Sequence, residues 1–519
     1  MLVTLSLDAQ HTYTNLDIIS GKVFLRVPSN TNVSSIVVKL EGESRTRLIP
    51  PSPAGPYNDR QRPVLEVHKL LYRLQVVFPP PNLQIGPAWQ QKSYTLNTGQ
   101  YEYPFSFKIP FNNACTAINS LGTNAAFSGL GLEIARNPTS HVKQTLPPTL
   151  SGFPGLAEIR YYCKVTVNRP SLFKENPRGF AHFNFLPIEP PRPPRSDGEA
   201  YARRQHQFNP DIVTKAKSKQ SWLGGMFGPN SPKEPDLQPS TPRPPPRFMV
   251  DARLPNPAIL TCNDDIPLRI IIKQLSERTE MLFLQNLQVE LIGYTKIRAH
   301  EMIRQESNSW IVISLSNMAM PLGTPADTIG TESEINREYW QRRPLPNTVA
   351  PTFDTCNISR FYELEVRLGL GYGSYKQGQD QLVVLPLRLP VRVFSGIAPP
   401  RALLDAMASS PVPARLPLKP PRPGPISTYS GPSLAPPAPY AAFPQTPVAE
   451  NPPWMQQYPP VQGAYLPQQG APEYEEAPPP SYEDAVGSDL PPIDGPRRDY
   501  APPPPVEGGL RLSGDEKGR

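Results

Sequence analysis

The sequence predicts an all-β protein, with two tandem β-sandwiches of the immunoglobulin-like type followed by a disordered, proline-rich tail. Apolar and polar residues alternate along strand-length runs through the first 398 residues, and the pattern of the first half recurs in the second. The chain has 73 prolines among 519 residues, and from Arg401 onward about a quarter of the residues are proline. Folded sheets and a proline-rich tail are therefore expected in one chain.

The first sandwich is predicted over residues 1–195. Ile36, Val38 and Leu40 fall on one face of an extended strand, while Lys39 and Glu41 fall on the other. Runs such as Gly21 to Val27 and Tyr162 to Val167 behave in the same way, and no long amphipathic helix pattern interrupts them. This alternation is typical of sheets with one packed and one solvated face.

The second sandwich is predicted over residues 248–398, as a repeat of the first. Four pairs of segments match in the same order along the two blocks: 22–27 with 268–272, 36–42 with 287–293, 161–167 with 361–366, and 185–188 with 384–387. A single match would mean little, because strand patterns resemble one another. Four in the same order indicate two related sandwiches.

Two segments are predicted to lack a core. Residues 196–247 are charged and then proline-rich, which predicts a disordered linker between the sandwiches. Residues 399–519 have too few aliphatic side chains to offset the entropy of ordering, so this tail is also expected to be disordered. The tail is net acidic, whereas the first 400 residues are net basic, which suits an anionic membrane surface or an acidic partner.

Several functional classes are disfavoured. The first residues show no signal peptide, and no run reaches the ~20 apolar residues that cross a bilayer, so a cytoplasmic protein is expected. The four cysteines and six histidines are scattered without metal-ligand spacing, and reduced thiols fit best. No catalytic, cofactor-binding or metal-binding residue is predicted, and no nucleic-acid partner is expected, since no GxSxG, HExxH or nucleic-acid-binding signature is present.

Several longer phrases make residues 1 to about 400 resemble the fungal α-arrestins, also called arrestin-related trafficking adaptors. These phrases are 13–23 (YTNLDIISGKV), 39–46 (KLEGESRT), 102–110 (EYPFSFKIP) and 393–397 (VFSGI). The resemblance implies the arrestin fold, in which two immunoglobulin-like sandwiches are joined by a hinge. It also implies an adaptor that brings HECT-type ubiquitin ligases to plasma-membrane transporters. The long insert between the blocks departs from the family pattern and leaves the placement of the two sandwiches open.

The strongest short motif is the PPPSYEDAV string of residues 478–486. Pro479 and Pro480 favour a polyproline II helix, and their rings can pack between the aromatic side chains of a WW-domain groove. Tyr482 offers a flat apolar ring with a polar tip, and Val486 follows one helical turn later as a second apolar contact. We therefore expect these four residues to bind a WW domain.

Weaker motifs accompany it. Pro472 and Tyr474 belong to a partial copy of the PPxY motif and are candidates for an auxiliary WW-binding site. Pro417, Pro420 and Arg422 match a proline-rich sequence that SH3 domains bind. The basic insert, with the apolar stretch 222–227, suits peripheral contact with an anionic membrane, although a solvated linker is the plainer interpretation.

The function expected from these features is recruitment: the sandwiches contact a membrane cargo and the tail holds a WW-containing ligase, at the plasma membrane and endosomes. Two alternatives remain open from the sequence. One is an arrestin-like signalling scaffold for an ambient-sensing membrane receptor, with SH3 partners and no ligase. The other is a sorting-coat subunit, for which the WW-binding tail would be superfluous.

Overall fold

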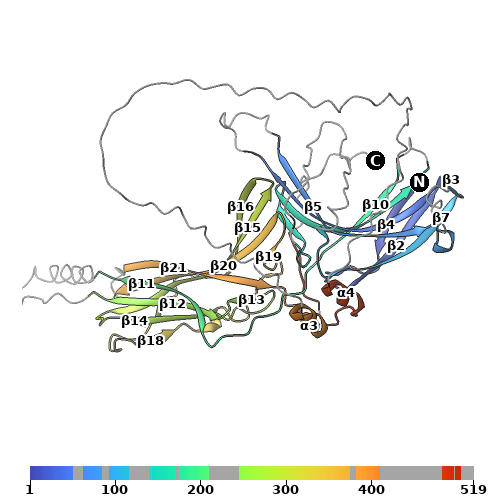
Figure 1. The fold of residues 1–519 in the computed structure, drawn as a ribbon. Helices are drawn as coiled ribbons and strands as arrows, with labels where there is room; N and C mark the ends of the chain where they lie inside the picture. The colour runs from blue at the N-terminus through green and yellow to red at the C-terminus, as the bar shows by residue number, and fades with distance from the viewer. Residues whose placement is uncertain are drawn as a thin grey trace, which may run out of the picture. The chain divides into compact units, whose positions relative to one another are not determined.

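A computed structural model confirms the all-β prediction (Figure 1). Strands make up nearly all the regular structure of the residues that it describes, and no described helix is long and apolar enough to cross a membrane. The described residues are 1–50, 62–84, 93–115, 141, 143–170, 175–209, 245–373, 381–409, 482–495 and 497–503.

The first sandwich packs two antiparallel sheets around one core. One sheet has the strand order β1 (Leu2–Leu7), β2 (Ile18–Val27), β7 (Gly99–Lys108). The other has the order β10 (Arg178–Phe183), β9 (Ala157–Asn168), β4 (Ser35–Leu48), β5 (Val64–Phe78), with β8 (Leu150–Phe153) beside β9. Short strands β3 (Thr31–Val33) and β6 (Tyr94–Leu96) pair with each other, and a 3-10 turn, η1, spans Pro81–Leu83. Every second side chain of β2 from Ile19 to Val27 is buried or nearly so, as the alternation predicted.

The second sandwich also packs two sheets around a core of its own, and its strand pairs are antiparallel except for the parallel pair β13 and β21. One sheet has the order β11 (Glu199–Gln207), β12 (Arg247–Pro255), β14 (Arg269–Gln274), β18 (Glu332–Glu334). The other has the order β13 (Ile259–Thr261), β21 (Gln381–Phe394), β20 (Ile358–Gly373), β15 (Met281–Ala299), β16 (Met302–Leu315). Strands β17 (Met320–Pro321) and β19 (Phe353–Asp354) extend it, and η3 spans Arg337–Tyr339.

The predicted repeat is visible in the strand register. Gly42 of β4 lies opposite Tyr161 of β9, and Gly293 of β15 lies opposite Tyr362 of β20. In both places the tyrosine ring covers the glycine, so that a Cβ would stand 2.6 Å from a ring carbon at Gly42 and 2.8 Å at Gly293. Both tyrosine hydroxyls donate to a backbone carbonyl earlier in the chain, Pro147 and Ala350 respectively. The fourth matched pair does not hold, because residues 185–188 follow β10 outside any strand whereas 384–387 lie within β21.

The predicted linker is wrong at its start, because Glu199–Gln207 form strand β11, paired with β12 along its whole length. The sequence of this strand does not alternate between apolar and polar residues, because most side chains of β11 are polar and exposed or half-exposed. This is usual for a strand at the edge of a sheet. Arg203 holds the strand in place through two hydrogen bonds of 2.7 and 2.8 Å to the buried carboxylate of Asp251. The second sandwich therefore begins near residue 199. Residues 210–244 of the predicted linker lie outside the described residues.

The predicted disordered tail is also wrong for two of its segments. Helix α3 (Arg401–Ser409) follows the second sandwich directly, and helix α4 (Tyr482–Asp489) lies beside it (Figure 1). Leu403 of α3 is fully buried with Leu16, Phe111 and Ile188 in a third, smaller apolar cluster. The prediction used the composition of the whole tail, which is rich in proline and poor in apolar residues. These two segments nevertheless bury their few apolar residues against the sandwiches. Residues 410–481 lie outside the described residues.

We predict that Gly42→Ala destabilises the protein by about 1–3 kcal/mol, because the new methyl group would overlap the Tyr161 ring in a packed core. Chemical denaturation would measure this loss as a lower midpoint concentration, with an unchanged slope of the unfolding free energy against denaturant. The matched control is Gly99→Ala in β7, where the nearest atom to a Cβ is 3.8 Å away. Equal midpoints for the two variants would contradict the close approach of Tyr161 to Gly42.

Candidate functional site

The residues of the expected WW motif lie at the edge of the described structure. Pro479 and Pro480 fall outside it, as do the weaker candidates Pro472, Tyr474, Pro417, Pro420 and Arg422. The backbone of Tyr482 begins α4, and Val486 is half-buried in the same helix. The chain directly after the motif is therefore folded, and it is bound to the sandwiches.

Helix α4 packs against the first sandwich. Gly487 is buried, and a Cβ there would lie 3.1 Å from Leu16 Cδ2, so the helix approaches closely because this residue has no side chain. Leu490 and Ile493 pack on the small apolar cluster of Leu16 and Phe111. The Lys108 ammonium donates to the carbonyl oxygens of Ser488 (2.7 Å) and Leu490, where the helix dipole favours a cation.

Arg497 anchors the segment to the first sandwich. Its Nη2 donates to Asp17 Oδ1 at 2.7 Å, and the Asp17 side chain is only 3% exposed. The other oxygen of Asp17 accepts from the Thr14 backbone amide at 2.8 Å. A buried carboxylate needs such partners, because an unpaired charge away from water is costly.

The next residues bond to both sandwiches. Arg498 Nη1 donates to Asp264 Oδ1 (2.8 Å) and to the carbonyl of Cys262 (2.7 Å) in the second sandwich. Tyr500 is buried, and its hydroxyl donates to the Thr149 carbonyl of the first sandwich. Burial raises the pKa of Tyr500 well above its usual value, so the ring stays neutral. We call residues 482–503 the docked segment.

The sequence contains a pattern that indicates this docking, although the proline content of the tail predicted disorder. Val486, Leu490 and Ile493 are spaced by four and three residues, and the pair Arg497 and Arg498 follows them in an otherwise acidic tail. Such spacing is typical of an apolar face on a helix and its extension. Proline content averaged over the tail concealed a short segment of different character.

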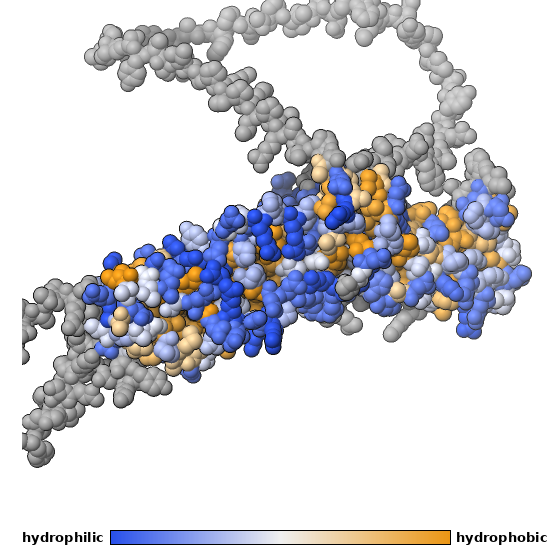
Figure 2. Space-filling view, turned by 90° about the horizontal axis from the view of Figure 1, so that it is seen from below, coloured by the Kyte–Doolittle hydropathy of each residue, from blue (hydrophilic) through white to orange (hydrophobic). Residues whose placement is uncertain are grey.

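A cleft of about 750 Å³ opens near the docked segment. Its lining includes Phe111 and Glu189 of the first sandwich, Arg360 and Phe361 of the second, and Met407 of α3. The lining mixes both charges with exposed aromatic surface. On the face shown in Figure 2, hydrophilic residues dominate the left half of the described surface, and hydrophobic residues gather among hydrophilic ones toward the right. Exposed apolar groups do not identify a partner by themselves.

A buried ionic cluster stabilises the outer face of the β4, β5 and β9 sheet. Glu43 pairs with Arg45 at 2.6 Å, with Lys69, and with Arg160 at 3.3 Å, and it accepts the Tyr162 hydroxyl at 2.6 Å. Burial alone would raise the pKa of Glu43, but the three cations outweigh it and hold this pKa far below its usual range. The carboxylate is therefore charged at neutral pH and has a partner for each oxygen, as expected of a structural group.

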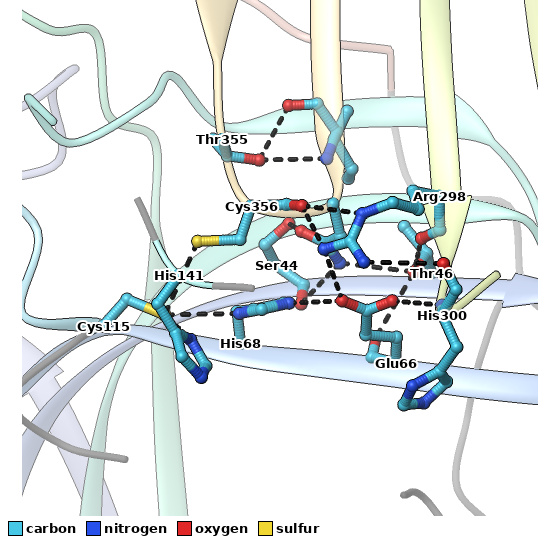
Figure 3. Close-up of polar contacts among 12 residues, drawn as sticks. Ser44, Thr46, Glu66, His68, Cys115, His141, Arg298, His300, Thr355 and Cys356 are labelled. Carbon is cyan, nitrogen blue, oxygen red and sulfur yellow. Dashed lines mark hydrogen bonds and ion pairs between the residues drawn. The ribbon is translucent and has the colours of Figure 1, made fainter. Parts of the chain in front are cut away.

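Four side chains that the sequence left scattered come together at the junction of the sandwiches (Figure 3). These are His68 of β5, Cys115, His141 and Cys356, and they could hold a metal ion. The sequence does not reveal this group, because its members lie far apart along the chain and only the fold brings the four segments together. None of the four cysteines of the chain forms a disulfide.

We predict that Arg497→Glu loosens the docked segment, because it removes the bond to Asp17 and sets a second carboxylate beside a buried one. Amide hydrogen exchange between residues 485 and 495 should become at least about tenfold faster. Arg26→Glu, a charge reversal at an exposed position of β2, is the control and should leave exchange there unchanged. Unchanged exchange in Arg497→Glu would show that the ion pair does not hold the segment.

Comparison with known proteins concerns mainly the first sandwich. Residues 3–182 match the family model described as the arrestin (or S-antigen) N-terminal domain. The chain is also similar to a protein named arrestin-related trafficking adapter 10 from the yeast Lachancea thermotolerans, with 29% identity over 112 residues. That similarity covers 20% of this chain and 25% of the yeast protein. The arrestin family is non-enzymatic, in agreement with the absence of catalytic motifs from the sequence. The first sandwich of the chain is therefore similar to the arrestin N-terminal domain over nearly its whole length, residues 3–182.

Proposed function

We propose that the protein is a ubiquitin-ligase adaptor, which links a HECT-type ligase through its WW domains to plasma-membrane transporters for ubiquitylation and endocytosis. The observation that supports this most is the position of the motif. The PPPSY residues 478–482 directly precede and enter α4, and the docked segment is bonded to both sandwiches. A ligase bound at the motif would thus be attached close to the folded body.

Attachment close to the body matters because a single WW–peptide contact is weak, on the order of micromolar. A ligase held near a cargo that the sandwiches bind acts at a raised effective concentration, and this concentration falls as the connecting chain lengthens. The docked segment shortens the connection from the whole tail to the few residues around the motif. Ubiquitin transfer would then need no chemistry from the adaptor itself.

The cargo side of the proposal rests on the arrestin domain and on charge. The similar yeast protein is named a trafficking adapter. The first 400 residues are net basic, which favours contact with the anionic cytosolic face of a membrane and with acidic segments of membrane proteins. We accordingly propose a cytoplasmic protein that is recruited to the plasma membrane and endosomes, with transporters or receptors as partners.

We predict that Tyr482→Ala weakens binding of the full chain to a tandem-WW fragment by about 2 kcal/mol or more, roughly thirtyfold, because an anchoring ring leaves its pocket. Pro479→Ala should cost less, since the neighbouring prolines still favour polyproline II. Tyr474→Ala is the matched control, a tyrosine lost from the degenerate upstream copy, and should change the titration little. Equal affinities for Tyr482→Ala and the unaltered chain would remove the main support for ligase recruitment.

We further predict that a peptide spanning 477–486 binds the same WW fragment more tightly than the full chain does. In the full chain Val486 is half-buried in α4, so a WW groove that uses Val486 must first displace this helix from the first sandwich. Arg497→Glu should bring the affinity of the full chain toward that of the peptide, whereas Arg26→Glu should not. If the peptide and the chain bind equally well, binding and docking are independent.

A further inference from the structure

The junction of the two sandwiches contains a compact group of two thiols and two imidazoles. His68, Cys115 and Cys356 are buried and His141 is half-buried, and their four ligand atoms lie within 4.8 Å of one another. His68 and Cys115 belong to the first sandwich and Cys356 to the second. We propose that these four side chains bind one Zn²⁺ ion, which fastens the two sandwiches together.

The three distances that involve Cys115 are close to those of a tetrahedral zinc site. With Zn–S bonds of about 2.3 Å and Zn–N bonds of about 2.0 Å, tetrahedral angles separate two sulfurs by about 3.8 Å and a sulfur from a nitrogen by about 3.5 Å. The two Sγ atoms of Cys115 and Cys356 are 3.7 Å apart. Cys115 Sγ lies 3.2 Å from His68 Nδ1 and 3.3 Å from His141 Nδ1. A Cys₂His₂ set of this size fits zinc in a closed, structural site.

The second ring nitrogen of His68 has the partner that metal-bound histidines usually have. Its Nε2 lies 2.6 Å from Glu66 Oε1, and the Glu66 carboxylate is itself held by Arg298 Nη2 at 2.9 Å and by the His300 amide (Figure 3). A carboxylate in this position fixes the tautomer with a proton on Nε2, which leaves the Nδ1 lone pair directed at Cys115. Arg298 Nε also donates to the Cys356 carbonyl at 3.1 Å, so one side chain orients ligands from both sandwiches.

The backbone around each remaining ligand is fixed by hydrogen bonds. The Ala114 amide donates to Leu70 O of β5 at 2.8 Å, which holds Cys115 beside His68. The Asn113 amide donates to Gln144 O at 2.7 Å, and this bond brings the segment that follows His141 alongside. Cys356 lies in a turn closed by the Thr355 hydroxyl, which donates to Ile358 O at 2.7 Å. The ligands are therefore preorganised, as a high-affinity site requires.

The alternatives differ in chemistry. Thiol and imidazole ligands favour zinc over magnesium or calcium, which prefer oxygen. A disulfide between Cys115 and Cys356 would need the sulfur atoms to approach from 3.7 Å to about 2.05 Å. A hydrogen-bonded thiol cluster without metal would leave the thiols protonated, whereas zinc binding releases their protons.

The test is the metal content of the full-length chain, purified under reducing conditions with zinc supplied and excess zinc removed by gel filtration. Mass spectrometry should find about one zinc per chain. The double variant C115S/C356S should lose it. The matched control C163A/C262A removes the two other buried thiols, which lie in the separate cores, and should keep the metal. Zinc-free wild type, or full retention in C115S/C356S, would overturn the proposal.

A second measurement needs no variant and so does not depend on how the substitutions fold. Cobalt exchanged into the wild-type protein should give the strong visible bands of a tetrahedral site and a near-ultraviolet thiolate band. A strong chelator should lower the unfolding temperature by roughly 5 °C or more, with recovery on adding zinc. An octahedral cobalt spectrum or a chelator-insensitive transition would refute the site. A denatured, metal-free chain lighter than the reduced sequence by two hydrogen atoms would also refute it, because this is the mass of a Cys115–Cys356 disulfide.

Discussion

Glu66 carries a fully buried carboxylate at the place where the two sandwiches meet. An ionised group in that position would destabilise the junction if it lacked partners, and it has them from both sides: His68 from its own strand, and Arg298 with the His300 amide from the other sandwich. A neighbouring hydrogen bond also connects the two sandwiches: the Ser44 hydroxyl of the first donates to the Asn357 side-chain oxygen of the second at 2.6 Å. The contact between the sandwiches is thus made specific by buried polar groups that are satisfied only when both are present.

The docked segment adds a second connection of a different kind. Arg497 bonds to the first sandwich and Arg498 to the second, and Tyr500 is buried and bonds back to the first. Of these bonds, only the Arg498–Asp264 pair is partly exposed on both sides and therefore weak, whereas Arg497 neutralises the buried Asp17 carboxylate. The Glu66 junction is suited to permanent attachment. In the docked segment only helix α4 has to yield when the motif is bound, because Arg497, Arg498 and Tyr500 still hold the chain to the sandwiches. The proposed adaptor therefore combines a rigid body with an adjustable ligase-binding end.

Much of the fold could be predicted from the sequence, because the patterns that indicate strands involve residues close together along the chain. Alternation at Ile36, Val38 and Leu40 indicated the core face of β4, and the matching phrases indicated the repeat that Gly42 and Gly293 display. The failures came where the determining contacts are distant. Strand β11 is polar because it lies at an edge, the docked segment is short within a proline-rich region, and Cys356 meets His68 only after both sandwiches have formed. No spacing rule along the chain can detect such a meeting.

We propose that this protein connects a WW-containing ligase to membrane cargo. The most direct measurement is quantitative affinity purification of the full-length chain from its own cells, in parallel with the Tyr482→Ala form. We expect a HECT-type ligase to be recovered with the unaltered chain and lost from the variant, while membrane transporters are recovered with both. Recovery of the ligase with both forms at equal yield, or of no transporter with either, would contradict it.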